Sequence, residues 1–172
     1  MFKKLFGLDK KVETQDIPEQ EIILSPLDGK VVSIEDVPDP TFSQKMMGDG
    51  FAVEPSNGKV ISPATGEIIQ IFPTKHAIGI KTLGGLEVLI HIGLETVNMK
   101  GEGFTAHVQE GDSIKAGQPL VDFDLELVKE KAASTITPVI ITNIDEAVAS
   151  IEKISKEQLT AGETVLTIKV KR

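Results

Sequence analysis

Two histidines, His76 and His91, carry the most concentrated chemistry in a chain that has three histidines and no cysteine. They lie fifteen residues apart, on two apolar runs that a Gly-Gly pair separates. If the runs form a hairpin with Leu83-Gly84 at its tip, residues whose numbers sum to 167 face each other, and 76 and 91 meet that condition. Directly opposed residues have Cβ atoms about 4.5–5.5 Å apart. The spacing therefore predicts two imidazoles that hold one small guest: a phosphoryl group, a metal ion or a shared proton.

A phosphoryl group suits such a pair of imidazoles. The neutral ring offers an unprotonated nitrogen near physiological pH, since its unperturbed pKa is about 6.5. An apolar surround disfavours the charged ring and limits hydrolysis of the product. Phosphoryl transfer otherwise requires alignment and charge stabilisation, which a second histidine supplies by donating N–H to a phosphoryl oxygen. Thr74 stands two residues before His76, where it would hydrogen-bond that ring and fix its tautomer.

The composition narrows the choice of partners and compartment. The chain has 172 residues, 18 of them basic and 26 acidic, with a net charge of −8 and neither Trp nor Tyr. We therefore expect no nucleic-acid partner, because the chain lacks both a basic excess and aromatic rings suited to stacking. An acidic surface favours a basic protein partner. The lack of cysteine, of an apolar run of about 20 residues and of a signal-peptide pattern predicts a cytoplasmic protein.

Residues 1–11 differ from the rest of the chain in charge, with four lysines and one aspartate giving a local charge of +3. Two phenylalanines and a leucine would share one face of a short helix, which suits peripheral contact with anionic lipid at the inner face of the membrane. A frayed, solubilising terminus accounts for the same residues, because eleven residues make a marginal helix in water. We predict a mobile N-terminal segment over residues 1–19 and a single β domain over residues 20–172.

Short β-branched runs punctuated by Gly, Pro and Asp fill the chain from Ile22 onward, with the spacing typical of an all-β sandwich or barrel. The predicted fold class is an all-β antiparallel β-sandwich or barrel-sandwich with a few short helices. Helical signals are limited to residues 122–132, with an acidic start, and 143–148, with an asparagine cap. The expected strands cover residues 30–34, 67–71, 76–81, 86–92, 117–123, 137–142 and 164–170.

An internal repeat organises the first half of the predicted domain. The pattern S-P-x-x-G begins at Ser25 and recurs 37 residues later at Ser62, and a β-branched run follows each copy. The proline can open a turn and the glycine can supply a positive φ, so each copy predicts a tight turn that leads into a strand. Two copies indicate a pseudo-symmetric sandwich, because a solenoid needs three or more units.

The segment from Gly85 to Val97, which reads Gly-Leu-Glu-Val-Leu-Ile-His-Ile-Gly-Leu-Glu-Thr-Val, resembles a known phosphorylation-site signature. It is that of the glucose-type enzyme IIA proteins of the bacterial phosphoenolpyruvate:sugar phosphotransferase system. The resemblance runs from about Ile22 to the C-terminus and includes the string Thr-Lys-His-Ala at residues 74–77. It implies that the β-sandwich is a duplicated hybrid motif.

The same resemblance implies roles for three residues. His91 would be the phosphoryl acceptor, becoming tele-phosphohistidine when the histidine phosphocarrier protein HPr donates to it. His76 would stabilise the phosphate, and Thr74 would orient His76. The phosphoryl group would then pass to a cysteine of a membrane enzyme IIB domain and on to glucose or a related sugar.

The resemblance further implies an apolar ring around the active site on which partners dock. Methionines suit such a surface, because their side chains adapt to different partners. Glu95 stands where some members have aspartate, and His107 matches no functional position and is interpreted as a surface strand residue. We expect a monomer that requires no cofactor. The predicted ring residues are Phe42, Met46, Met47, Phe72, Ile78, Leu89 and Val97.

Two other functions compete with that of a phosphoryl carrier. A zinc hydrolase would use His76 and His91 as metal ligands, since imidazole is a common zinc ligand and lysostaphin-type peptidases share a similar β scaffold. Those peptidases use H-x-x-x-D and H-x-H ligand sets, and here the third ligand is missing, so zinc would bind weakly or need a partner's carboxylate. A regulatory module would dock permeases or kinases through the apolar ring, and the negative charge of a phosphoryl group would oppose that docking.

Overall fold

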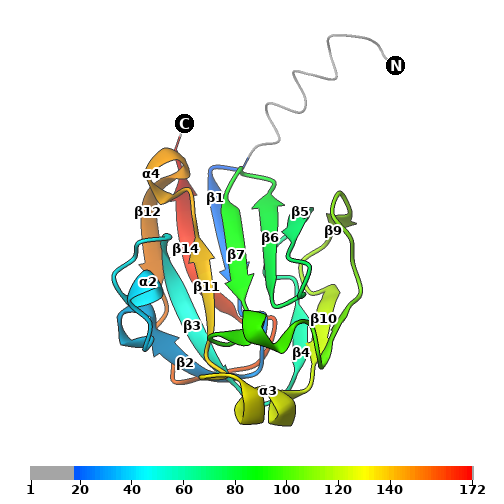
Figure 1. Cartoon of the computed structure of the whole chain (residues 1–172). Helices are drawn as coiled ribbons and strands as arrows, with labels where there is room; N and C mark the ends of the chain where they lie inside the picture. Colours follow the sequence, from blue (N-terminus) through cyan, green and yellow to red (C-terminus); the bar gives the residue numbers. More distant parts are fainter. Residues whose placement is uncertain (1–17, 172) are drawn as a thin grey trace, which may run out of the picture.

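The computed structural model describes residues 18–171 and contains an antiparallel β-sandwich with short helices in its connections (Figure 1). The predicted fold class is confirmed, whereas the helix considered for residues 1–11 lies outside the described residues. The largest sheet has eight strands, in the order β13-β2-β3-β11-β7-β6-β5-β9. Its strands are β2 (Gly29–Ser33), β3 (Asp49–Pro55), β5 (Gly66–Ile71), β6 (Ala77–Thr82), β7 (Glu87–His91), β9 (Ser113–Ile114), β11 (Thr137–Ile141) and β13 (Gln158–Leu159).

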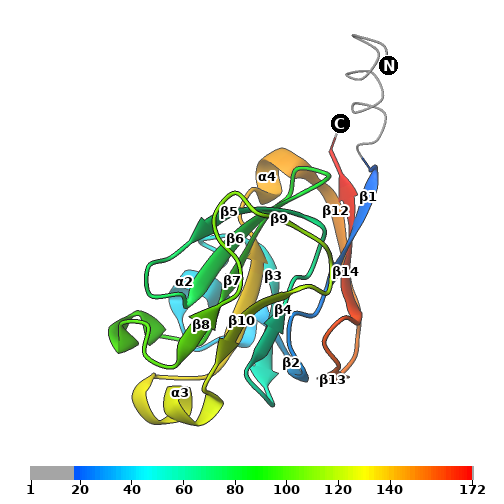
Figure 2. The ribbon, with the colours of Figure 1, turned by 90° about the vertical axis from the view of Figure 1, so that its right-hand side faces the viewer.

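Two three-stranded sheets complete the sandwich, in the orders β1-β14-β12 and β4-β10-β8. In the side view, β1, β12 and β14 form a layer on the opposite side of the molecule from β6 and β7 (Figure 2). A core between the layers joins Ile23, Ile90 and Ile168, none of which is exposed. The strands are β1 (Gln20–Leu24), β4 (Lys59–Ile61), β8 (Phe104–Ala106), β10 (Pro119–Phe123), β12 (Val148–Lys153) and β14 (Thr164–Val170).

The helices are short, and among residues 18–171 none is long and apolar enough to cross a membrane. The helix predicted over residues 122–132 begins later, because Asp122 and Phe123 extend β10. Asp124 then caps it by accepting the Leu127 N–H at 3.1 Å. The helices are η1 (Ile34–Asp36), α2 (Pro40–Ser43), η2 (Thr96–Met99), α3 (Leu125–Lys131) and α4 (Ile144–Ala147).

Asn143 precedes α4 as predicted, but its side chain does not cap that helix. Its Oδ1 accepts the Glu87 N–H at 2.9 Å, and its Nδ2 donates to the Gly85 carbonyl at 2.9 Å. The predicted asparagine cap is therefore wrong, because the amide pairs better with the open backbone groups beside it. This side chain fixes the start of β7, the strand that ends at His91.

The two S-P-x-x-G turns have the same hydrogen bonding, which fits the predicted pseudo-symmetry. In each, a buried serine hydroxyl donates to the carbonyl two residues on, at 2.7 Å from Ser25 and 2.6 Å from Ser62. The copies also interlock. The Leu24 N–H donates to the Pro63 carbonyl and the Ile61 N–H donates to the Pro26 carbonyl, both at 2.9 Å. The exchange ties the strand that precedes each motif to the other copy.

The eight-stranded sheet is apolar on both faces near its centre, and every residue of β11 is buried. Val139 and Ile141 belong to the core between the sheets, whereas Ile140 between them belongs to a second cluster on the outer face. This outer cluster lies beneath the histidine pair, and its member Phe42 contacts the His91 ring. Its buried members are Ile34, Val37, Phe42, Ala52, Ala77, Leu89, Leu94 and Ile140.

Candidate active site

The β6–β7 hairpin, which carries the candidate site, differs in register from the prediction. Ala77 pairs with His91, so the numbers of paired residues sum to 168 and the predicted sum of 167 is wrong. The cause is the length of the loop. Three residues, Leu83 to Gly85, separate the last hydrogen-bonded pair, Thr82 and Leu86, whereas a two-residue turn was expected. Gly85 closes the loop with a φ of +90°, as a glycine does in a three-residue hairpin loop that ends in a bulge.

The two imidazoles nevertheless lie side by side, with ring centroids 5.0 Å apart and ring planes at 83°. His76 precedes β6, at the end of a turn in which Lys75 has a left-handed φ of +62°. Because this backbone is irregular, the His76 ring reaches the His91 side of the sheet although the two residues are not paired. The Ile92 N–H donates to the His76 carbonyl at 2.7 Å and holds the backbone in place.

His91 has one ring nitrogen fixed by the backbone. Its Nδ1 lies 2.8 Å from the Gly93 carbonyl, and because a carbonyl only accepts, Nδ1 carries the hydrogen. The neutral ring then has its lone pair on Nε2. Gly93 reaches this position with a φ of +71°, and a Cβ there would lie 2.9 Å from the Ser134 carbonyl oxygen. A glycine is therefore required at residue 93 for the chain to turn back onto the ring.

Thr74 lies within hydrogen-bond distance of the second imidazole, with its Oγ1 2.5 Å from His76 Nδ1. Thr74 is the third residue of a turn that the Lys75 N–H closes by donating to the Phe72 carbonyl at 2.7 Å. Pro73 occupies the second position of this turn, where its fixed φ is favourable. The His76 side chain is buried, so the contact between hydroxyl and ring is shielded from water.

Both rings are neutral at physiological pH. Burial, with a smaller contribution from the nearby His91, lowers the pKa of His76 to about 4. Burial also lowers the pKa of His91, while the Gly93 carbonyl and the Asp39 carboxylate oppose that shift. A low-dielectric environment disfavours the charged ring, and this keeps the lone pair on His91 Nε2 free of a proton.

Two phenylalanines flank the histidines and complete a row of four rings. The Phe42 centroid lies 5.2 Å from that of His91, and the Phe72 centroid lies 5.5 Å from that of His76. The contacts are tilted or edge-on, which are the favourable geometries for aromatic pairs. The packing restricts rotation of both imidazoles.

The predicted docking ring contains one error, Ile78. This residue is fully buried in the core between the sheets, so it cannot contact a partner. Because Ala77 lies opposite His91, residue 78 points to the other face of the sheet, and Gly79 takes the outer position opposite Leu89. The other six residues stay candidates: Phe42 and Leu89 are buried in the outer cluster, Phe72 is partly buried, and Met46, Met47 and Val97 are exposed.

Asp39 is a residue of the site that the sequence reasoning missed. Its carboxylate acts on His91, and its Oδ1 accepts the Thr41 N–H at 3.0 Å as the cap of α2. The signal was present in the string Asp-Pro-Thr, since aspartate followed by proline at the first helical position is typical of a helix start. Glu95, by contrast, is exposed, with a left-handed φ of +60°.

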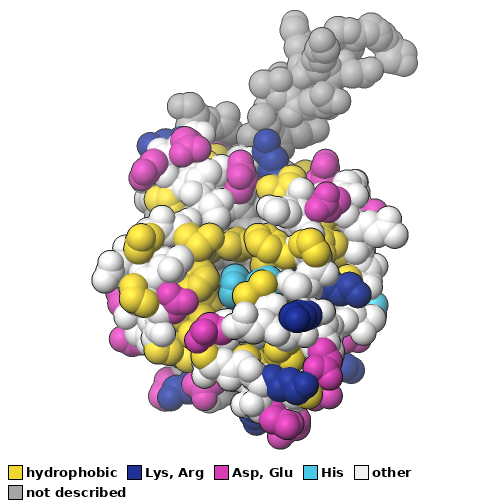
Figure 3. All heavy atoms as spheres, viewed as in Figure 1, with side chains coloured by type: hydrophobic (Ala, Val, Ile, Leu, Met, Phe, Trp, Pro, Cys, Tyr) yellow, Lys and Arg dark blue, Asp and Glu magenta, His cyan; other side chains and the backbone are white. Residues whose placement is uncertain are grey.

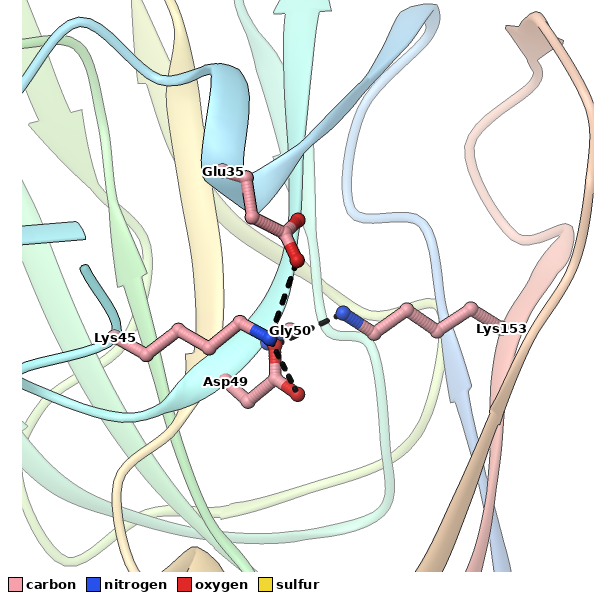
Figure 4. A network of polar contacts seen from close by, with 5 residues as sticks. All are labelled: Glu35, Lys45, Asp49, Gly50 and Lys153. Carbon is pink, nitrogen blue, oxygen red and sulfur yellow. Dashed lines mark hydrogen bonds and ion pairs between the residues drawn. The ribbon is translucent and has the colours of Figure 1, made fainter. Parts of the chain in front are cut away.

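An ion-pair network fixes the segment from Glu35 to Lys45, which contains α2 (Figure 4). The Lys45 ammonium lies 3.2 Å from Glu35 and 3.8 Å from Asp49, and these contacts raise the pKa of Lys45. Lys153 of β12 reaches the other Asp49 oxygen at 2.9 Å, and that oxygen also accepts the Gly50 N–H at 2.8 Å. Through Lys45 and Asp49, the network links Glu35 before α2 and Lys45 after it to β3 and β12.

The metal-site hypothesis gains no support from the side chains. Within residues 18–171, no group of three or more His, Cys, Asp or Glu residues is placed to hold a metal ion. A zinc hydrolase needs a third protein ligand beside His76 and His91, and the described part of the chain does not supply one. His107 is exposed as predicted, but it lies in a bend just after β8, so its predicted place in a strand is wrong; its Nε2 lies 3.0 Å from Asp122.

Fold and site together define a class of protein: an antiparallel β-sandwich that presents a neutral, oriented histidine pair on an apolar outer face. The family model for the phosphoenolpyruvate-dependent sugar phosphotransferase system, EIIA 1, matches residues 21–147. The chain belongs to this family. It is a phosphotransferase component, a phosphoryl carrier of a sugar phosphotransferase system that works through a histidine.

Relatives and a solved structure agree with this assignment, and the resemblance drawn from the sequence is confirmed. The chain is 67% identical over 172 residues to the PTS system glucose-specific EIIA component of Halalkalibacterium halodurans, covering 99% of each chain. It is 60% identical over 147 residues to that of Bacillus cereus, covering 86% of each. The structure of glucose permease IIA from Mycoplasma capricolum matches with a TM-score of 0.82 at 36% identity, covering 87% of this chain and 96% of that one.

The lowered pKa of His76 makes the stability of the fold depend on pH. Below about pH 6.5 the unfolded chain binds a proton at this residue that the folded chain does not bind until about pH 4. The free energy of unfolding should therefore fall by up to about 3 kcal/mol between these two pH values. Urea unfolding at pH 7, 6 and 5 measures the slope, which should be shallower in His76→Gln.

Thr96→Val is the control for this pH experiment. It also alters a buried polar residue, one that donates to the Ile92 carbonyl at 2.6 Å, but it removes no titrating group. It should lower stability at every pH and keep the wild-type slope. Equal slopes for wild type and His76→Gln would contradict the lowered pKa.

Proposed function

We propose that His91 accepts a phosphoryl group at Nε2 from the histidine phosphocarrier protein HPr and passes it to a cysteine of a membrane enzyme IIB domain. The observation that carries the proposal is the Gly93 carbonyl on His91 Nδ1, which leaves the Nε2 lone pair as the nucleophile. The names of the relatives support glucose as the sugar served. The site of action would be the cytoplasm, at the inner face of the membrane where enzyme IIB lies.

The two transfer steps balance without any further reactant. The His91 Nε2 lone pair attacks phosphorus as the P–N bond to the donor's imidazole breaks, and the electron pair of that bond stays on the donor ring. Positive charge then develops on the His91 ring, where the Gly93 carbonyl and the Asp39 carboxylate are placed to stabilise it. In the second step a cysteine thiolate attacks, and His91 leaves as a neutral imidazole.

His76 acts as a neutral hydrogen-bond donor to the phosphoryl oxygens. When the Thr74 hydroxyl donates to His76 Nδ1, the single ring hydrogen lies on Nε2, the nitrogen that is then free to bind phosphate. With a pKa of about 4, the His76 ring is neutral in the unphosphorylated protein throughout the physiological range. A neutral donor stabilises the transferring group without holding it as tightly as a cation would, which suits a carrier that must also release it.

The apolar surface around the histidines supports transfer between proteins. Docking on it would exclude water from the reacting atoms and limit hydrolysis. Phosphorylation would place a charge of about −1.5 to −2 beside His91, among Phe42 and Leu89 of the outer cluster. That change would favour release of the donor, and the same change would underlie the regulatory alternative, in which permeases or kinases respond to the phosphorylation state.

The direct test of the proposal is phosphorylation in vitro by enzyme I, HPr and phosphoenolpyruvate, with mass-spectrometric mapping of the product. We expect one acid-labile, base-stable phosphoryl group on His91 and none on His91→Ala. His107→Ala is the matched control, because it removes an exposed histidine that follows β8 and lies outside the histidine pair, and it should be fully phosphorylated. Full phosphorylation of His91→Ala would contradict the assignment.

Thr74 provides a second test, of its role as a positioning residue. Thr74→Val keeps the shape of the side chain but removes the hydroxyl that contacts His76 Nδ1. Loss of a hydrogen bond of this kind should slow phosphoryl transfer about tenfold. The HPr concentration at half-maximal rate should not change, and Thr74→Ser should restore the rate. An equal loss in Thr74→Ser and Thr74→Val would contradict the hydroxyl's role.

A further inference from the structure

A β-bulge in β5 brings an isoleucine to the outer face of the sheet. Ile68 pairs with Ile80 and Gln70 with Gly79, so Ile69 between them is the extra residue. In such a bulge two residues of one strand oppose a single residue of its neighbour. Ile69 accordingly lies near the outer face of Gly79, with Cγ1 and Cδ1 placed 3.4 and 3.8 Å from where a Cβ of that glycine would be.

Gly79 is what leaves room for this side chain. It lies directly opposite Leu89, two residues before His91 on the same face of β7. A larger residue at position 79 would occupy the space next to Leu89 that Ile69 now borders. The outer face thus has an apolar row that runs from Ile140 on β11 through Leu89 to Ile69 on β5.

Ile69 differs in exposure from the isoleucine that precedes it. It is 41% exposed, whereas Ile68 is completely buried in the core. The space-filling view shows a hydrophobic band on this face, beside the histidines and extending to both sides of them (Figure 3). Met46 and Met47 lie on the α2 side of the histidines and Val97 on the η2 side, and each is exposed.

We propose that Ile69 is a docking residue for the phosphohistidine-bearing donor protein and forms the β5 side of the apolar surface around His91. The inference rests on the proposed function, and it adds a contact that was not among the predicted ring residues. Ile69 takes the outer place that Ile78 was wrongly predicted to fill.

The size and charge of the surface fit such a donor. Ile69 lies two strands from His91, about 10 Å away in the direction across the sheet. A standard protein interface covers about 800 Å² on each partner, a patch roughly 30 Å across, so a donor centred on His91 would cover Ile69. The chain has a net charge of −8, and Asp39 acts on the reacting ring, which favours a donor with basic groups around an apolar centre.

The test measures phosphorylation rate against the concentration of phosphorylated HPr. Ile69→Asp should raise the concentration at half-maximal rate about tenfold and leave the maximal rate within about twofold of wild type. Ile22→Asp is the matched control. Ile22 is 51% exposed on β1, in the layer opposite β6 and β7, and its substitution should change neither quantity.

A rescue variant separates docking from damage to the fold. Ile69→Ala should weaken docking, and adding Gly79→Leu should restore it, because the new side chain would fill the same outer space from the neighbouring strand. Gly79 has no positive φ, and the three atoms nearest to a Cβ there, at 3.4 to 3.8 Å, belong to the side chains of Ile69 and Gln70. Recovery in the double variant supports the proposal.

Three outcomes would overturn the inference. If Ile69→Asp behaves as wild type does while wild type is phosphorylated on His91, the docking role fails and the proposed function stands. A lower maximal rate with unchanged half-saturation would assign Ile69 a structural role instead. If HPr does not phosphorylate the wild-type chain at all, the proposed function fails, and the docking role fails with it.

Discussion

The hydrogen bond between His91 Nδ1 and the Gly93 carbonyl is the contact on which the chemistry of this protein depends. In the proposed mechanism it fixes which nitrogen is the nucleophile, and it would leave a stabilising oxygen next to the charge that forms when that nitrogen is phosphorylated. Its geometry requires a left-handed residue two positions after the histidine, with no room for a Cβ. Burial acts together with this bond, because it keeps the ring neutral and so keeps the lone pair available.

The site also depends on a sheet with two apolar faces. The inner face packs against the opposite layer and makes the sandwich stable, while the outer face provides an apolar floor beneath the histidines. Strand alternation separates the two tasks, since Ile90 belongs to the core and its neighbours Leu89 and His91 lie on the outer side. Substitutions at outer positions such as Ile69 and Gly79 should therefore leave the packing of the core between the sheets largely unchanged.

Much of this site could be predicted from residue types and spacing. The closeness of the two histidines, the strands that flank them and the hydrogen bonding shared by the two S-P-x-x-G turns follow from local patterns, although only the first turn has a positive φ at its glycine, Gly29. The register was not predictable from the same signals, because a Gly-Gly pair fits both a two-residue and a three-residue hairpin loop. Because of that difference of one residue, the prediction assigned Ile78 to the outer face, whereas it lies in the core between the sheets.

Other features depended on contacts between segments distant in sequence. Asn143 looked like a helix cap, yet it binds the β6–β7 hairpin more than fifty residues before it. His76 contacts His91 although the predicted register was wrong, because the irregular turn at Lys75 places the His76 ring on the same side of the sheet as His91. A bulge such as that at Ile69 leaves no clear mark in a run of β-branched residues, so its outward side chain emerged only from strand pairing.

The most direct test of the central claim is the tautomer of His91, measured by long-range nitrogen-15 NMR at pH 7 on the unphosphorylated protein. The Gly93 carbonyl requires Nδ1 to give the signal of a protonated nitrogen and Nε2 that of an unprotonated one. A hydrogen on Nε2 instead would leave the proposed nucleophile without its lone pair and would contradict the account.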